Sequence, residues 1–145
     1  MPRLLAYLPC EKVVTEQGSN NVSIISVMET ITIGVPQGSA PPPPQTFVGM
    51  NWTIYSLWQK EEGDVGEFQS QSIFFAPNGE RVFEGVATTW RFEPEQHRYQ
   101  VIDRVGGFPI WAEGPCRLSL LLKTPSDADF REVSSVIIVV KYSPA

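Results

Sequence analysis

Hydrophobic and polar residues alternate along much of this chain, which is the pattern of a strand with one buried face. In segment 116–123 every second residue is apolar and the residues between them are polar, with Leu121 as the one exception. The apolar set is Cys116, Leu118, Leu120 and Leu122. A turn rich in proline and glycine, 108–115, leads into this segment. We therefore expect a strand whose apolar set faces a core and whose polar set mostly faces water.

The same pattern recurs between clusters of Gly, Pro, Asn and Asp, whereas no segment has the spacing of an amphipathic helix. Strands are predicted over 3–9, 22–33, 46–58, 66–76, 80–92, 97–105, 116–123 and 132–142. About eight short strands at this spacing are typical of an antiparallel β-sandwich, either Ig-like or jelly-roll-like. At 145 residues, the chain is expected to form a single all-β domain over 1–145.

Two connections have a clear local signature. Residues 77–80, Pro-Asn-Gly-Glu, predict a hairpin turn between the fourth and fifth strands, because Asn-Gly tolerates the positive φ angles of a type I′ turn. Residues 36–45 are rich in proline, which fixes φ and removes amide donors. This segment is interpreted as an extended connection between the second and third strands, with docking to a partner as the less favoured alternative.

The predicted last strand has a run of residues that is apolar on both faces: Val136, Ile137, Ile138, Val139 and Val140. A strand of a two-layer sandwich has only one face packed within the domain, so something else must cover the other face. A second copy of the chain is the favoured cover, which predicts a homo-oligomer with either Ile137 and Val139 or the alternate set in its interface. The Pro-rich segment or the first strand, folded over the outer face, is the alternative.

Composition narrows the range of partners and compartments. Acidic residues number 16 against 11 basic ones, giving a net charge of −5, so a surface for nucleic acid is not expected. The apolar run near the N-terminus is too short for an export signal, and no stretch approaches the roughly 18 apolar residues of a membrane span. The simplest expectation is a cytoplasmic protein without membrane contact.

The chain offers little for catalysis. His97 is the single histidine, and no phosphate loop, nucleophile elbow or zinc-binding helix motif accompanies it. Cys10 and Cys116 lie far apart in the sequence and are interpreted as two small buried residues rather than a disulfide or a metal site. We therefore expect no enzyme activity, no catalytic residues and no cofactor.

Two acidic loops are candidates for binding Ca²⁺. One follows the third predicted strand and the other precedes the last, so both are expected at the same end of a sandwich. Oxygen ligands suit Ca²⁺, although charged turn residues are more often simply solvated. The candidate ligands are Glu61, Glu62, Asp64, Asp127 and Asp129.

The tryptophans are candidates for binding carbohydrate, because flat aromatic faces pack against sugar rings. Trp52 and Trp90 fall on the apolar sides of their strands, which assigns them to the core. Trp58, near a strand end, and Trp111, in the turn before 116–123, are better placed for a ligand. For both residues, packing in the core or against a loop is the competing interpretation.

Taken as a whole, the chain resembles a bacterial family of small uncharacterised all-β proteins, a domain of unknown function. The resemblance rests on a short first strand, the segments 11–14 and 23–27, and a Phe-Pro turn and a glycine, Gly114, before a Leu-rich strand. The chain departs from the family at Cys116, where an aromatic residue usually stands. The resemblance implies one β-sandwich without an assigned activity, and therefore no functional residues.

These observations favour a non-enzymatic β-sandwich that acts as an interaction or assembly module. Two alternatives stay open. One is a carbohydrate-binding module that uses loop tryptophans, and the other is a structural protein of a phage or capsid-like particle.

Overall fold

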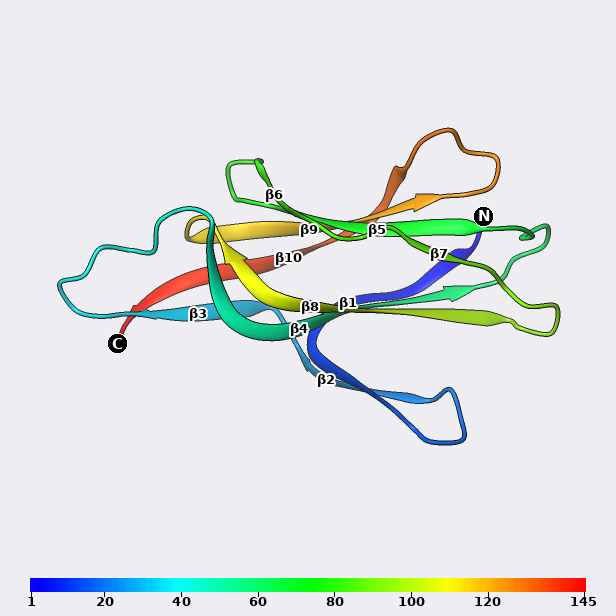
Figure 1. Ribbon diagram of the computed structural model, residues 1–145, viewed down its shortest axis with the longest axis horizontal. Coiled ribbons are helices and arrows are strands. Elements are labelled where there is room, and N and C mark those ends of the chain that lie inside the picture. Colours follow the sequence, from blue (N-terminus) through cyan, green and yellow to red (C-terminus); the bar gives the residue numbers. More distant parts are fainter.

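The computed structural model describes all 145 residues and contains strands but no helix (Figure 1). The chain is therefore all-β, as the alternation predicts. There are ten strands rather than about eight: β1 (Arg3–Thr15), β2 (Val22–Val27), β3 (Thr30–Val35), β4 (Thr46–Gln59), β5 (Phe68–Phe75), β6 (Arg81–Glu84), β7 (Thr88–Trp90), β8 (Arg98–Ile110), β9 (Gly114–Lys123) and β10 (Arg131–Pro144).

The strands form two packed sheets, the arrangement of a β-sandwich (Figure 1). The four-stranded sheet has the order β2-β1-β4-β8. The six-stranded sheet has the order β3-β10-β9-β5-β6, and β7 also pairs with β5. The expectation of a purely antiparallel protein is wrong at one place, because β3 and β10 run parallel. A parallel pair is possible there because β3 and β10 are separated in sequence by most of the chain.

Two predicted strands are each divided in the structure. The segment 22–33 contributes β2 to one sheet and β3 to the other, and the chain crosses between the sheets at Met28, whose side chain is buried in the core. Ser26 takes a positive φ of 54° just before this crossing. The segment 80–92 is divided at Gly85, where an added Cβ would lie 3.1 Å from the carbonyl oxygen of Ser72. A Cβ at this position would crowd the Ser72 carbonyl, so glycine favours this close approach of the backbone to β5.

The predicted hairpin between the fourth and fifth strands is present as the β5–β6 connection. Gly79 has a φ of 88°, whereas Asn78 does not have a positive φ. The turn is therefore not the expected type I′, which requires positive φ at both positions. Asn78 instead uses its side-chain oxygen to accept a hydrogen bond from the Glu80 amide at 3.0 Å. The Pro-rich segment 36–45 connects β3 to β4, as predicted, at the left-hand end of Figure 1.

The core between the sheets is built around aromatic rings. Trp90 of β7 lies 5.5 Å from Trp58, 5.1 Å from Phe68 and 5.0 Å from Tyr99, measured between ring centroids. Each buried indole also has a hydrogen-bond acceptor: Trp58 donates to the Ser56 hydroxyl at 3.0 Å, and Trp90 donates to the Ser70 hydroxyl at 3.1 Å. The rings therefore contribute apolar area without leaving a buried donor unpaired. The thiols of Cys10 and Cys116 are buried and free.

We predict that Trp58→Ala destabilises the fold strongly, because Trp58 has 0% exposure and contacts Trp90. Truncating a buried tryptophan typically costs about 3–5 kcal/mol in unfolding free energy. Urea denaturation followed by circular dichroism measures this loss. The control Val86→Ala removes an apolar side chain from a residue that is 88% exposed, and it should leave the midpoint nearly unchanged. A Trp58→Ala midpoint equal to that of the control would contradict this assignment.

Candidate functional site

The two tryptophans expected to bind a ligand lie in different environments. Trp58 has 0% exposure, so its expected role as a surface platform is wrong. β4 continues to Gln59, which keeps Trp58 on the inward face beside Trp52 and Ile54. Trp111 lies between β8 and β9 and is half-buried, without another aromatic ring stacked on it. The two residues therefore do not form a shared aromatic surface.

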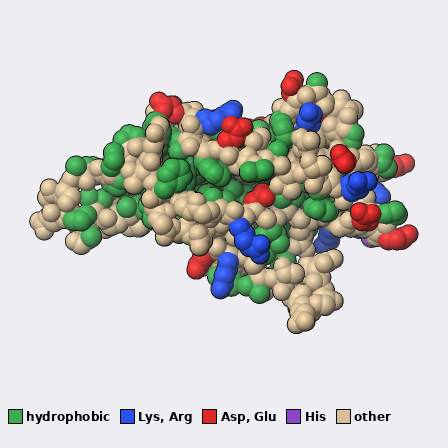
Figure 2. All heavy atoms as spheres, in the orientation of Figure 1, with side chains coloured by type: hydrophobic (Ala, Val, Ile, Leu, Met, Phe, Trp, Pro, Cys, Tyr) green, Lys and Arg blue, Asp and Glu red, His purple; other side chains and the backbone are tan.

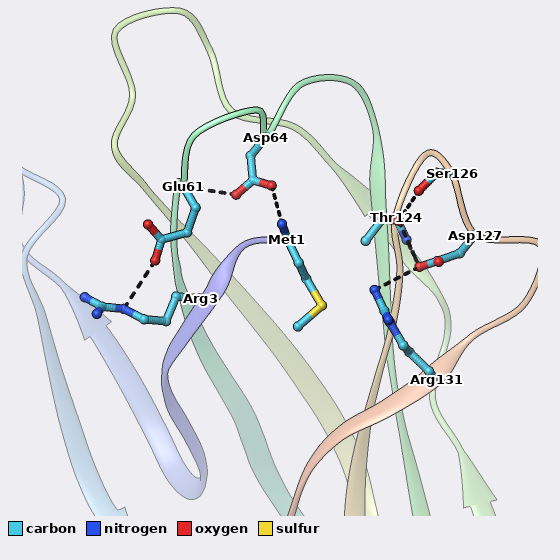
Figure 3. Close-up of polar contacts among 8 residues, drawn as sticks. All are labelled: Met1, Arg3, Glu61, Asp64, Thr124, Ser126, Asp127 and Arg131. Atoms are coloured by element: carbon cyan, nitrogen blue, oxygen red, sulfur yellow. Dashed lines mark hydrogen bonds and ion pairs between the residues drawn. The ribbon is translucent and has the colours of Figure 1, made fainter.

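The two acidic loops do lie at the same end of the sandwich, around a shallow hollow (Figure 3). Within the first loop, Asp64 is buried with 5% exposure. One of its carboxylate oxygens lies 3.0 Å from the amino nitrogen of Met1, and the other accepts the amide hydrogen of Glu61 at 2.8 Å. Glu61 in turn faces Arg3 at 3.6 Å. Protein groups thus occupy the oxygens of Asp64.

The second loop is organised in the same way by Asp127. Its carboxylate accepts hydrogen bonds from the amide of Thr124 at 2.9 Å and from the Thr124 hydroxyl at 2.8 Å (Figure 3). Arg131 lies 3.6 Å away. The donors of Thr124, and then the charges of Arg131 and Lys123, lower the pKa of Asp127. Asp127 therefore fixes the turn between β9 and β10.

The expected Ca²⁺ ligands are not gathered into one site. No group of three or more His, Cys, Asp or Glu side chains is placed to hold a metal ion. Glu62 and Asp129 are exposed, while Asp64 and Asp127 point at their own loops. Figure 2 shows acidic and basic side chains intermingled at this right-hand end. The sequence interpretation fails because turn carboxylates bind nearby amides and cations first.

The apolar run on β10 is divided between two environments. Ile138 and Val140 are buried with 0% and 1% exposure, and Val136 packs against the same core. These three residues are unavailable for an interface, so the expectation that the alternate set Val136, Ile138 and Val140 forms the interface is wrong. On the opposite face Ile137 is 53% exposed and Val139 is half-buried. Ile137 is paired with Arg117 of β9, and Val139 is paired both with Pro115 of β9 and with Thr30 of β3.

Neighbouring strands extend this outer face. The Arg117 guanidinium of β9 lies 4.7 Å over the ring of Phe75 on β5 and 3.5 Å from the carboxylate of Glu132 on β10. Ser119 lies on β9, the strand between β5 and β10. It has 1% exposure, and its hydroxyl has no hydrogen-bond partner. Leu121 is half-buried on the same face. We call Phe75, Leu121, Ile137 and Val139 the outer patch.

A buried polar cluster between the sheets was not predicted. The Tyr7 hydroxyl lies 2.8 Å from the Ser72 hydroxyl, and Thr88 donates to the Asp103 carboxylate at 3.3 Å. Burial raises the pKa of Asp103, and the Thr88 hydrogen bond only partly offsets this effect. Asp103 and Ser72 line a cleft between β8 and the segment 83–86. Gln and Ser alternate over residues 69–72, so Ser70 and Ser72 lie on the same, inward face of β5. This alternation is the one sequence signal that marks Ser72.

A second unpredicted feature is a hollow of about 550 Å³ on the outer side of the four-stranded sheet. It lies between the β1–β2 hairpin and the adjacent part of β4 and β8, and we call it the hairpin hollow. Tyr55, Leu57 and Ile102 line it from the sheet, and Asn20 and Asn21 line it from the hairpin. Its residues come from three separate segments, so no local motif in the sequence marks it.

Comparison with known proteins gives no further assignment. No protein-family model matches the chain, and no curated protein is similar to it in sequence. The family resemblance therefore stays a prediction. The structure contains no helix long and apolar enough to cross a membrane.

We predict that Asp127→Ala lowers the melting temperature at neutral pH, because the ionised carboxylate holds the turn. A pKa lowered in the folded state means that this stabilisation is present above the unfolded value near 3.8 and is lost as the pH falls through the folded value. The difference from wild type should therefore shrink on acidification. Thermal melts between neutral and acid pH measure it. The control Asp129→Ala, on the exposed part of the loop, should change little, and equal effects of the two variants would contradict the assignment.

Asp103→Asn should have the opposite effect. The raised pKa means that burial disfavours the charged carboxylate, so stability is highest below the unfolded value near 3.8 and falls as the pH rises through the folded value. Asparagine keeps an acceptor for Thr88 without the charge. We therefore expect a higher melting temperature than wild type at pH 7, and no gain at acid pH. Asp129→Asn removes an equal charge at an exposed position and serves as the control. A lower melting temperature for Asp103→Asn at pH 7 would contradict this account.

Proposed function

We propose that this protein is a non-enzymatic assembly module that associates with a second copy of itself through the outer patch. The exposure of Ile137 carries the proposal. Ile137 lies near the middle of β10 and leaves 53% of its surface in water, while its neighbour Ile138 is fully buried. Neither the Pro-rich segment, which connects β3 to β4, nor β1, which belongs to the other sheet, covers this face. An apolar surface of this kind favours a partner.

The charges along β10 support a second copy as that partner. The outward-facing residues of this strand are Glu132, Ser135, Ile137, Val139 and Lys141. Glu132 shares a face with Ser135, three residues later, because the register shift between Glu132 and Ser134 adds one residue to the strand. An acidic residue thus lies at one end, a basic residue at the other, and Ile137 near the middle. A two-fold axis beside Ile137 places Glu132 of each copy near Lys141 of the other.

The two-fold arrangement has two consequences. Each copy uses the same surface, so the assembly closes at two copies and does not grow into a filament. The outer patch contains only four apolar side chains, and Arg117 and Glu132 already pair within one chain. The association is therefore expected to be weak and reversible, at the small end of specific interfaces.

We predict that the chain is a dimer at high micromolar concentration and dissociates on dilution, with a mass that approaches 16.2 kDa. Ile137→Lys should shift it to the monomer without loss of thermal stability, because the side chain is already half exposed. Light scattering coupled to size-exclusion chromatography measures the mass. A wild-type mass of one chain throughout the micromolar range would overturn the proposal.

Two sets of variants sharpen this test. Val86→Lys adds the same charge at a residue that is 88% exposed and does not belong to the outer patch, so its mass should match wild type. Glu132→Lys or Lys141→Glu alone brings like charges together across the axis and should weaken the dimer. The double variant restores opposite charges and should recover most of the association. Equal behaviour of the single and double variants would contradict the two-fold arrangement.

A further inference from the structure

The hairpin hollow lies on the other side of the molecule from the outer patch. Thr15 and Val22 are the last pair of the β1–β2 ladder, and the turn beyond them carries Asn20 and Asn21. The tip of this hairpin is the projecting tan lobe at the lower right of Figure 2, and residues 17–21 in it carry no charged side chain. The Gln100 side-chain amide of β8 donates to the Asn20 carbonyl at 2.6 Å and so connects the tip to the sheet. The volume of about 550 Å³ lies within the usual range for small-molecule sites.

Tyr55 presents its hydroxyl to this hollow. The residue as a whole is 4% exposed, while its hydroxyl forms no hydrogen bond with another protein group and keeps some access to water. Burial raises the pKa of the hydroxyl, and the Arg98 guanidinium partly offsets this effect. In the free protein the hydroxyl therefore bonds to water, and a ligand that displaces this water must replace its hydrogen bond. Tyr55 lines the hairpin hollow, so a ligand bound there is able to replace water as the partner of the hydroxyl.

The rest of the lining restricts the chemistry of that group. Side-chain amides from Asn20, Asn21, Gln96 and Gln100 offer both donors and acceptors. No carboxylate lines the hollow, so it is not suited to a cation. Arg98 is the only basic residue there, and one basic residue is not enough to bind a chain of phosphates. An apolar ligand would leave the amides unpaired.

A sugar ring fits this combination. Its hydroxyl groups both donate and accept hydrogen bonds, and its C–H groups pack on apolar or aromatic side chains. Leu57 and Ile102 provide such side chains beside Tyr55 on the same face of the sheet. We infer that the hairpin hollow is a carbohydrate-binding site in which the Tyr55 hydroxyl and the amide of Gln100 contact ligand hydroxyl groups. This site is independent of the proposed self-association.

An array of immobilised oligosaccharides, both neutral and containing uronic acids, tests the inference with the wild-type protein. The best-bound oligosaccharide is then titrated calorimetrically into variants. Tyr55→Phe keeps the ring and removes only the hydroxyl, and Gln100→Ala removes the amide from a half-buried surface position. Each is expected to weaken binding by about 3- to 10-fold, the usual effect of losing one hydrogen bond.

Matched controls separate binding from stability. Tyr142→Phe removes another tyrosine hydroxyl that has no hydrogen-bond partner but lies outside the hollow, and Gln37→Ala removes an amide from the Pro-rich connection. Both should bind like wild type. Trp111→Ala tests the loop tryptophan and should also bind like wild type. The inference is overturned if no oligosaccharide on the array is bound, or if Trp111→Ala abolishes binding while Tyr55→Phe and Gln100→Ala do not affect it.

Discussion

The packing around Trp90 is the interaction on which the sandwich most depends. Trp90 lies on β7, a strand of only three residues that pairs with β5 alone. Its indole is stacked on Phe68 of the same sheet and on Tyr99 of the opposite sheet, and it also contacts Trp58 of β4. One side chain thus connects the six-stranded sheet to both β4 and β8. The indole nitrogen of Trp90 donates to the Ser70 hydroxyl of the neighbouring strand, and two further inward-facing serines pair with other buried aromatic residues.

Those serines explain why part of the fold is hard to infer from sequence. Ser56, Ser70 and Ser72 lie on inward faces, where an alternation argument expects apolar residues. Each is paired with the polar tip of a buried aromatic residue, so burial costs little. The alternation rule works in β9, where every inward position is apolar. It is less informative in β5, where small polar residues complete an aromatic core.

The candidate sites show the same limit. The alternation in β4 places Trp58 on the same face as Trp52 and Ile54, which predicts burial correctly. Its position near a strand end predicts exposure, and that prediction is wrong. The period-two argument predicts that only one set of the β10 run faces the core, but it does not identify which set. That choice depends on the register with β9, which is fixed by tertiary contacts. The hairpin hollow and the Asp103 cleft were not predictable, because each joins residues from strands that meet only in the folded chain.

The position of β10 also determines when the protein is able to fold. β10 occupies an interior place in its sheet, where Val140 pairs with Ile31 of β3 on one side and with Gly114 of β9 on the other. β3 has no other strand partner. During synthesis, β3 therefore leaves the ribosome long before the only strand that completes it, and its edge stays unpaired until residues 131–144 have emerged. Such a high contact order favours slow, post-translational closure of this sheet, and the exposed β3 edge is the part of the nascent chain most open to chaperones or to mispairing.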